Sequence, residues 1–242
     1  MKLISIFIFT FFAITTYGQE IKKDSTGADL KKVLIGVNFS PDVCYRTLKN
    51  IDGSATDFIK YWNGHDIIKF GYTTGFDICL NISKNIGLEM GIQYSNKGFQ
   101  TKKMELSFWT PEPNAPTKIA HRYNYHYLDI PLKANFTLGK KKVRFFSSAG
   151  LCVNFLVKKT ITSISEYSDG RTNRSTYPSG SDNNILNLSP ILSAGIDYKI
   201  NNQMNLRIEP TFRYEILKVY DGPIISENLW NAGLNIGYYF GF

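Results

Sequence analysis

The sequence predicts an all-β fold: an eight-stranded antiparallel up-and-down transmembrane β-barrel with short periplasmic turns and long extracellular loops. Three observations support this prediction. Apolar residues alternate with small or polar residues along eight segments, short and long connections alternate between those segments, and ionised residues keep to one of the two faces. Alternation with a period of two is typical of a β-strand.

The clearest strand is the C-terminal segment, Trp230 to Phe242. One face carries the apolar set Trp230, Ala232, Leu234, Ile236, Tyr238, Phe240 and Phe242. The other face carries Asn231, Gly233, Asn235, Gly237, Tyr239 and Gly241. An apolar face backed by glycine and asparagine is expected of a strand that has lipid outside and a tight polar interior.

The same alternation predicts the other seven strands. They cover about 33–46, 67–82, 86–102, 123–138, 143–160, 185–200 and 204–217. Three of these segments are interrupted by Pro131, Pro190 and Pro210. Because proline has no backbone N–H to donate, we expect a bulge or an unpaired position at each of them.

The connections between the strands differ in length in a regular way. The short ones are 83–85, 139–142 and 201–203, and the long, mostly polar ones are 47–66, 103–122, 161–184 and 218–228. Short turns at one end and long loops at the other are the pattern of an outer-membrane barrel. The long loops are then expected outside the cell, and an even number of strands leaves both termini in the periplasm.

The polarity of the two faces distinguishes a membrane barrel from a soluble one, which would turn its apolar face inward. Seven acidic and seven basic residues share the face opposite the apolar one: Asp42, Arg46, Lys69, Asp77, Glu89, Asp129, Lys133, Arg144, Asp197, Lys199, Arg207, Glu209, Arg213 and Glu215. Inside a lumen such residues pair with one another, which offsets the cost of burying each charge. Eight strands leave room only for side chains, so we expect no permanent pore.

The chain divides into three predicted segments. Residues 1–18 are a signal peptide with a positive start, an apolar run from Leu3 to Ile14, and small residues Thr16 and Gly18 before a cut at Gln19. Residues 19–32 are a flexible periplasmic leader, and residues 33–242 are the outer-membrane β-barrel domain. No later apolar stretch is long enough for a membrane helix. The predicted location is therefore the cell outer membrane.

Composition limits the partners. The formal net charge is +8 and the pI about 9.2, but an exported protein seldom meets nucleic acid, so no nucleic-acid partner is predicted. Outer-membrane lipid and lipopolysaccharide are the expected partners, together with a protein partner at the extracellular loops or periplasmic turns. The cysteines Cys44, Cys79 and Cys152 are interpreted as small interior residues without disulfides, because Cys44 and Cys79 lie at different heights.

One segment resembles a known family. The run Tyr127-Leu128-Asp129-Ile130-Pro131-Leu132-Lys133 resembles the PorT-like outer-membrane β-barrel family of Bacteroidetes, in which a Tyr-Leu-x-Ile-Pro-Leu strand is typical. The segment from Asn96 to Phe99 and the aromatic C-terminus are similar too. The resemblance implies an eight-stranded barrel without known catalytic residues. Because the namesake takes part in type IX protein secretion, an accessory role in that process is an alternative function.

A further alternative is an outer-membrane hydrolase with a rim or loop histidine. The histidines are His65, His121 and His126; the candidate bases are His121 and His126, and the candidate nucleophiles are Ser163, Ser165 and Ser168. No motif places a nucleophile beside a base, and two histidines five positions apart on one strand point to opposite faces. We therefore predict no catalytic, cofactor-binding or metal-binding residues.

The expected function is that of a small closed outer-membrane barrel, not an enzyme, with a structural or surface-interaction role. The segment 166–184 is predicted to be a mobile surface loop. Aromatic residues in the loops are interpreted as a membrane-surface girdle; they are Tyr61, Trp62, Phe108, Trp109, Tyr167, Tyr177, Tyr220 and Trp230.

Overall fold

The computed structural model describes residues 32–108, 114–179 and 184–242, so the predicted signal peptide and all but the last residue of the leader lie outside it. Within the described residues there are twelve strands and one helix. They are β1 (Val33–Asn50), α2 (Thr56–His65), β2 (Asp66–Ile67), β3 (Lys69–Asn81), β4 (Ile86–Thr101), β5 (Met104–Glu105), β6 (Lys118–Leu138), β7 (Val143–Glu166), β8 (Thr172–Pro178), β9 (Leu186–Lys199), β10 (Met204–Tyr214), β11 (Tyr220–Asp221) and β12 (Ile225–Gly241). No helix within these ranges is long and apolar enough to cross a membrane.

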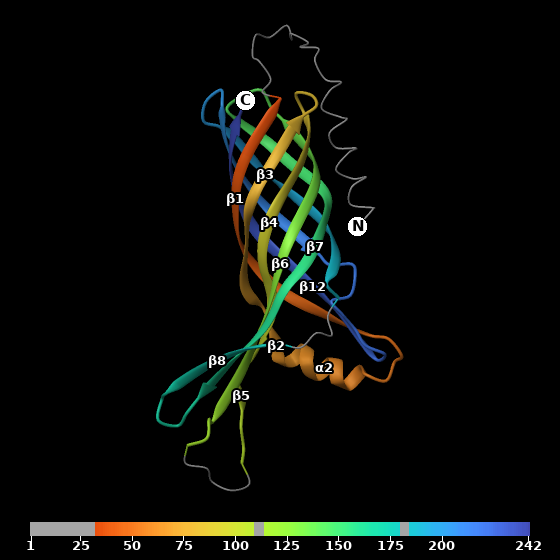
Figure 1. Ribbon diagram of the computed structural model, residues 1–242, viewed down its shortest axis with the longest axis vertical. Coiled ribbons are helices and arrows are strands. Elements are labelled where there is room, and N and C mark those ends of the chain that lie inside the picture. The colour runs from red at the N-terminus through yellow and green to blue at the C-terminus, as the bar shows by residue number, and fades with distance from the viewer. Residues whose placement is uncertain (1–31, 109–113, 180–183) are drawn as a thin grey trace. The chain divides into compact units, whose positions relative to one another are not determined.

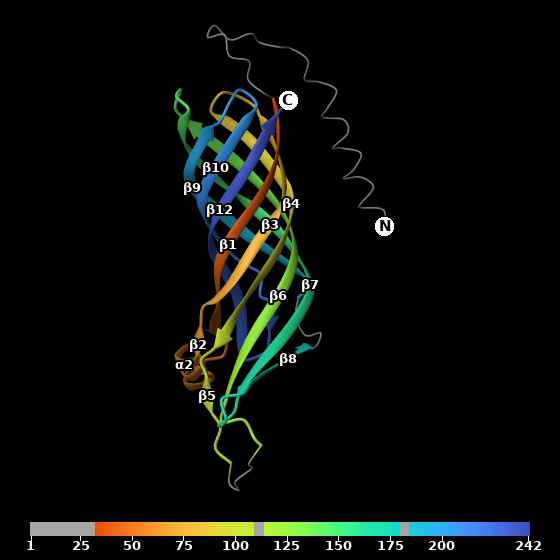
Figure 2. The same cartoon turned by 90° about the vertical axis from the view of Figure 1, so that its left-hand side faces the viewer.

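Eight of the strands pair into a closed ring, and every pairing is antiparallel. The order around it is β1, β3, β4, β6, β7, β9, β10 and β12, and β12 returns to β1. Figures 1 and 2 show these strands tilted around a common axis. The prediction of an all-β antiparallel barrel is confirmed. The short strands β2, β5, β8 and β11 lie outside the ring.

The two ends of the ring differ as the connection lengths predict. The tight turns lie at the end that holds the C-terminus, whereas α2, β5 and β8 lie at the opposite end (Figure 1). Local hydrogen bonds explain the turns. The Ser83 hydroxyl accepts from the N–H groups of Asn85 and Ile86, and the Asn201 side chain accepts from those of Gln203 and Met204. Gly139 supplies the positive φ, +122°, of another turn.

The apolar face points outward and the ionised face points inward, as predicted. On β10, Arg207 is 2% exposed while its neighbour Ile208 is 40% exposed. The carboxylates of Glu89 and Glu209 are buried as well. Cys44, Cys79 and Cys152 are free and buried, so their interpretation as interior residues without disulfides is confirmed.

The strand prolines lie where the pairing of strands is interrupted. Beside Pro131 the β4–β6 register skips two pairs, and beside Pro210 the β9–β10 register does the same. Pro190 pairs with Leu151 of β7, whereas the pairing of β9 with β10 stops at its neighbour Ile191. Each proline therefore pairs with one neighbouring strand and not with the other, because it has no N–H to donate.

The long connections contain more structure than the sequence predicted. The segment expected to be a mobile loop, 166–184, contains the strand β8, which pairs with an extended β7 through a turn at Gly170 with φ +82°. β6 begins at Lys118 and not at 123. All seven residues of β8 are exposed, mostly polar and without alternation. A strand with no buried face lacks the period-two signal on which the prediction rested.

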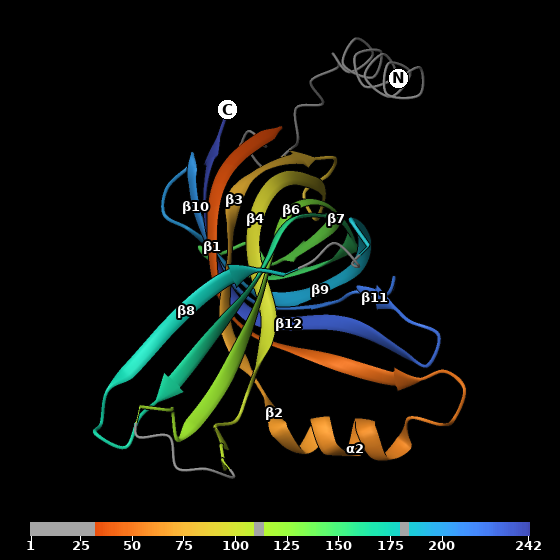
Figure 3. The ribbon, with the colours of Figure 1, turned by 60° about the horizontal axis from the view of Figure 1, so that its bottom comes forward.

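The segment 47–66, expected to be a loop, contains α2. The Asn50 side chain accepts from the N–H groups of Gly53 and Ala55 and so shapes the approach to the helix. α2 has no side-chain cap and buries none of its residues, which is why neither a capping motif nor an apolar stripe revealed it. Figure 3 shows α2 beside the mouth of the ring, apart from the sheet that carries β8.

Candidate functional site

The interior of the ring is filled near its short-turn end by a network of ion pairs. Glu89 bonds Lys133 at 2.5 Å and Arg207 at 2.8 Å. Asp197 bonds Arg207 at 3.1 Å and Arg144 at 3.0 Å. These carboxylates have two cationic partners each, an arrangement that compensates the cost of removing charges from water.

Aromatic rings complete the packing at this end. The Arg207 guanidinium lies 4.1 Å from the centre of the Tyr239 ring and 4.4 Å from that of Phe146. Glycine makes room for Tyr239, since a Cβ on Gly36 would come within 2.5 Å of its ring and a Cβ on Gly237 within 2.6 Å. Gly36 and Gly237 therefore leave the space that the Tyr239 ring occupies.

A second ion cluster lies further toward the long-connection end. Lys97 lies 3.5 Å from Asp129 and 3.3 Å from Glu215, and Arg213 lies 3.6 Å from Asp129. Lys97 was not among the interior charges predicted from the sequence. Its position two residues beyond Ser95, which faces inward, was the signal that could have found it.

An apolar cluster lies beyond this second ion cluster, at the long-connection end of the ring. We call it the upper plug, taking the long-connection end as the top of the barrel, although this end is drawn at the bottom of Figure 1. It consists of the buried residues Phe99, Tyr125, Tyr127, Val219 and Leu229. Val219 comes from the segment after β10, so a long connection folds back into the mouth of the ring. The ion network, the second ion cluster and the upper plug place buried side chains at successive levels of the interior. The absence of a permanent pore stays a prediction.

Arg46 anchors the elements that lie above the upper plug. Its guanidinium bonds Asp66 at 2.7 Å and Glu227 at 2.9 Å, and stacks 3.8 Å from the centre of the Phe99 ring. Tyr125 donates to Glu227 at 2.9 Å. Burial raises the pKa of Asp66, and the Arg46 charge opposes that shift. Asp66 and Glu227 were missed because they lie in segments predicted to be loops.

The structure brings one predicted base and one predicted nucleophile together. His121 Nδ1 lies 3.0 Å from Ser163 Oγ, and Ser163 Oγ lies 2.6 Å from the Tyr177 hydroxyl. His121 and Ser163 are directly paired across β6 and β7, and Tyr177 lies on β8 two residues from Ser175, the β8 partner of Ser163. Burial lowers the pKa of His121. Among the described residues, no carboxylate hydrogen-bonds His121, so the base has no third group to orient it.

The other candidates lie apart from these three residues. His126 Nδ1 bonds the Tyr94 hydroxyl at 2.5 Å on the outer wall, and His65 Nδ1 bonds the Tyr61 carbonyl at 2.7 Å on α2. Ser165 pairs with Ile119 and Asn173 in the sheet, and Ser168 lies in the turn before β8. Within the described ranges, no group of three or more histidine, cysteine or acidic residues is arranged to hold a metal ion.

Trp109 lies outside the described residues, and the other loop aromatics are not all in one place. Trp230 lies in the wall beside Tyr45 and Phe212, with ring centres 6.0 and 6.1 Å away, as a membrane girdle requires. Tyr61 on α2 and Tyr177 on β8 are exposed on elements outside the ring. The predicted girdle therefore does not extend to these two residues, and they form part of a surface beyond the barrel mouth.

Sequence comparison identifies the family. Residues 19–216 match the family described as outer membrane protein beta-barrel domain. The chain belongs to this family. An outer-membrane location follows from that membership, in agreement with the outward apolar face. No curated protein sequence matches the chain.

Solved structures of outer-membrane proteins are similar at low identity. Neisserial surface protein A is 11% identical with a TM-score of 0.44, and the match covers 87% of this chain and 97% of that one. OprG of Pseudomonas aeruginosa is 13% identical at 0.40, covering 87% and 97%. The protease OmpT of Escherichia coli is 12% identical at 0.41, covering 92% and 100%.

Proposed function

We propose that this member of the family is a small, closed, eight-stranded outer-membrane barrel with a non-enzymatic, structural or surface-interaction role. The observation that carries the proposal is the contrast between the interior of the ring and the elements beyond its mouth. The interior is occupied by the ion network and the upper plug, while α2 and the sheet of β5, β6, β7 and β8 project beyond the mouth (Figure 3). These projecting elements present exposed Phe58, Tyr61 and Tyr177 to a partner.

The absence of a pore can be measured directly. The full mature chain, refolded and inserted into planar lipid bilayers, should show no steady ion conductance. Heat-modifiable gel migration and recovery in the outer-membrane fraction should accompany this result. A stable conductance in the unmodified protein would contradict the closed barrel, and a freely soluble mature protein would contradict the membrane role.

The orientation places the long connections outside the cell and the short turns in the periplasm, following the usual asymmetry of such barrels. An epitope tag inserted at Gly170, in the exposed turn before β8, should be accessible to antibody on intact cells. The same tag inserted at Lys141, in a short turn at the other end, should become accessible only after the outer membrane is permeabilised. The reverse result would invert the orientation. N-terminal sequencing of the mature chain checks the cleavage before Gln19.

A partner is expected at the projecting surface. Photo-crosslinking groups placed at Tyr61 and at Tyr177 should capture the same protein, which a group at Phe136 on the lipid-facing wall should not capture. Replacing Phe58 and Tyr61 with alanine should abolish the capture without changing heat-modifiable migration. If all three positions capture the same proteins, the surface is not selective and the interaction role fails.

The finer family assignment, PorT-like in Bacteroidetes, and with it an accessory role in type IX secretion, rests on the motif from Tyr127 to Leu132. In the structure Tyr127 belongs to the upper plug and Leu132 faces outward. The motif therefore contributes residues to both the inner and the outer face of β6. Deletion of the gene should reduce the set of secreted proteins if the role applies, and an unchanged set would eliminate it.

The hydrolase alternative has one observation in its favour, the 3.0 Å contact between His121 and Ser163. Esterase and protease assays on His121→Ala, Ser163→Ala and His126→Ala test it. A genuine dyad requires that the first two variants lose activity and the third retain it. If none of the three substitutions alters the activity, these residues are not catalytic.

A further inference from the structure

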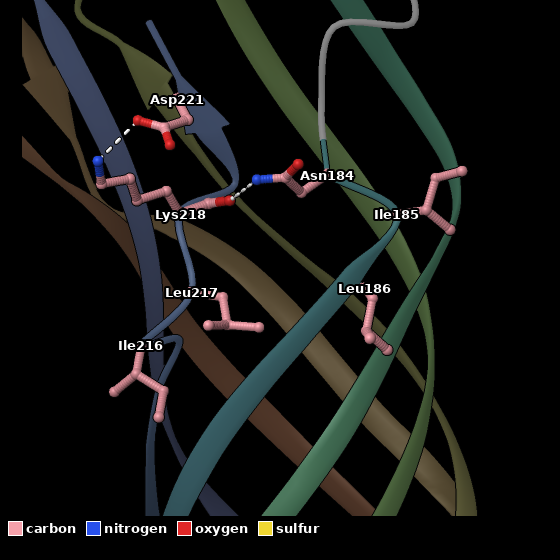
Figure 4. Close-up of a pocket in the computed structure, with 7 residues that line it drawn as sticks. All are labelled: Asn184, Ile185, Leu186, Ile216, Leu217, Lys218 and Asp221. Carbon is pink, nitrogen blue, oxygen red and sulfur yellow. Dashed lines mark hydrogen bonds and ion pairs between the residues drawn. The ribbon is translucent and has the colours of Figure 1, made fainter.

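A hollow of about 740 Å³ lies in the wall of the ring, between the start of β9 and the segment that follows β10. Figure 4 shows the residues that line it: Asn184, Ile185, Leu186, Ile216, Leu217, Lys218 and Asp221. In Figure 4 the aliphatic residues Leu186, Ile216 and Leu217 make up the lower half of the lining, and the polar residues Asn184, Lys218 and Asp221 lie in the upper half together with Ile185. We call this feature the wall hollow.

The wall hollow exists because two neighbouring strands separate and then meet again. Below it, the Ile216 N–H donates to the Leu188 carbonyl at 2.9 Å. Above it, the Asn184 N–H donates to the Val219 carbonyl at 3.0 Å, and the Asn184 side chain donates to the Lys218 carbonyl at 2.7 Å (Figure 4). The segment between these contacts has left the β9–β10 pairing.

A buried asparagine compensates for the lost strand pairing. The Asn228 side-chain amide lies 3.0, 3.5 and 3.2 Å from the carbonyl oxygens of Glu215, Ile216 and Leu217. Backbone carbonyls without a partner are costly in a membrane wall. The two N–H groups of the Asn228 amide are shared among these three carbonyls, which stabilises the opening.

The wall hollow opens toward the lipid and not toward the lumen. Leu186 and Ile216 are each 49% exposed, whereas their chain neighbours Asn187 and Glu215 are 0% and 1% exposed. Alternation along an extended chain sends adjacent side chains to opposite sides. Asn187 donates to Glu215 at 3.1 Å and closes the inner side.

Lys218 lines the polar edge of the wall hollow, and Lys158 lies on the neighbouring strand β7. Lys218 pairs with Asp221 at 2.7 Å, and both side chains are largely solvent-exposed. Lys158 is exposed on β7, two residues beyond Leu156, whose N–H donates to the Ile185 carbonyl of the lining. An exposed ion pair such as Lys218–Asp221 is weak, so Lys218 can exchange Asp221 for a more strongly charged partner.

We propose that the wall hollow binds one acyl chain of an anionic lipid of the outer leaflet, with the lipid phosphate between Lys158 and Lys218. An apolar lower half continuous with the lipid-facing wall matches an acyl chain, and cations on the side of the long connections match a headgroup. The assignment to the outer leaflet rests on the proposed orientation of the barrel. The lipid site itself requires only the membrane-facing wall.

Native mass spectrometry of the detergent-solubilised full chain tests the site with two lipids that have the same acyl chains. Dioleoyl-phosphatidylglycerol should be retained as a single copy, and dioleoyl-phosphatidylcholine, whose headgroup is neutral overall, should be retained much less. Free inorganic phosphate should not displace the lipid, because it has no chain for the aliphatic half. Equal retention of the two lipids would overturn the headgroup site.

Variants separate the two halves of the site. Lys158→Gln and Lys218→Gln should each weaken phosphatidylglycerol binding about fivefold, since a lysine near a lipid surface contributes roughly 1 kcal/mol. Asp221→Asn should strengthen binding because it removes the competitor for Lys218. Lys140→Gln, in a short turn at the opposite end, is the matched control and should leave binding unchanged. An effect of Lys140→Gln equal to those of the Lys158 and Lys218 variants would show non-specific attraction only.

Filling the aliphatic half gives an independent check. Leu217→Trp should abolish retention of the lipid, whereas Leu132→Trp, on the outer wall away from the hollow, should not. Heat-modifiable migration establishes that each variant is folded. Retention by folded Leu217→Trp equal to that of the unmodified chain would overturn the acyl-chain site. Failure of the proposed orientation is recognised separately, by tags accessible from the wrong side.

Discussion

Carboxylate–cation pairs contribute much more to stability in the lumen than in the elements beyond the mouth. In the lumen, the carboxylate of Glu89 is fully buried and bonds two cations. Beyond the mouth, Glu105 pairs with Lys118, and its side chain is 82% exposed. A buried charge that loses its partner is left uncompensated, whereas an exposed one returns to water. The barrel therefore depends on its charges, and the projecting sheet does not.

The difference extends to how each region is held. The ring is closed by pairing between all eight neighbouring strands, and its interior contains the ion network and the upper plug. α2 buries none of its side chains and is held near the mouth by a few contacts, such as Lys102 Nζ donating to the Gly64 carbonyl at 2.7 Å. Few buried contacts mean low local stability, so the projecting elements should open while the barrel stays folded.

The largest effect is expected from Glu89→Ala. Lys133 and Arg207 would each lose a buried partner, and we expect the free energy of unfolding to fall by about 3–5 kcal/mol. Urea unfolding in lipid vesicles, followed by heat-modifiable migration, measures this change. The matched control is Glu105→Ala, for which about 0–1 kcal/mol is expected. Equal losses in both variants would remove the contrast between the two regions.

A more local effect is expected from Arg46→Ala. The substitution removes the charged hydrogen bonds to Asp66 and Glu227, each with a contribution of about 1.5–3 kcal/mol. We expect proteolysis within 51–66 to become rapid while heat-modifiable migration is unchanged. Lys60→Ala, on exposed α2, is the control and should not change the cleavage rate. If Arg46→Ala unfolds the whole barrel, the anchor belongs to the barrel and the two regions are not separable.

The sequence predicted the region in which each strand has one buried and one lipid-facing side. Period two is visible along 204–214 because Arg207 and Glu209 alternate with Leu206 and Ile208, and one slip in register would reverse both faces. Glu89, Asp129 and Arg213 were assigned to the lumen on the same grounds. Lys97 was missed, since the interior face was not followed to the end of its strand.

Beyond the mouth no such signal exists in the sequence. β8 exposes both of its faces, so Thr172, Ser175 and Thr176 show no contrast of polarity. Arg46 was assigned to the interior correctly, but its partners Asp66 and Glu227 come from segments far apart in the chain. A pairing at such sequence separation is fixed by the closed ring and not by any local pattern. The proximity of His121 and Ser163 is of the same kind, since it depends on the register of β6 with β7.

An intermediate effect is expected where the wall itself opens. Asn228→Ala would leave the carbonyls of Glu215, Ile216 and Leu217 without their donor, at a cost of about 1–3 kcal/mol. Hydrogen exchange should increase in the segment after β10 and at the start of β9, and not in β3 on the other side of the ring. Asn235→Ala removes a buried lumen amide that donates to Glu209 at 3.0 Å, and is the comparison. Faster exchange at 215–219 in Asn235→Ala alone would contradict the role of Asn228.

The smallest effect concerns pH and the projecting sheet. Burial lowers the pKa of His121 below its ordinary value of 6.5, so the opened sheet binds a proton more readily than the closed one. The contribution of His121 to closure is therefore fully present above about pH 6.5 and declines as the pH falls below that value. Asp169, whose pKa is lowered by the Arg171 N–H, stays ionised in this range and does not interfere.

Amide exchange at Ser175, corrected for its intrinsic pH dependence, should accelerate between about pH 7.5 and about pH 5. His121→Gln, which cannot take up the proton, should remove this acceleration, and its persistence in that variant would assign the pH response to another group.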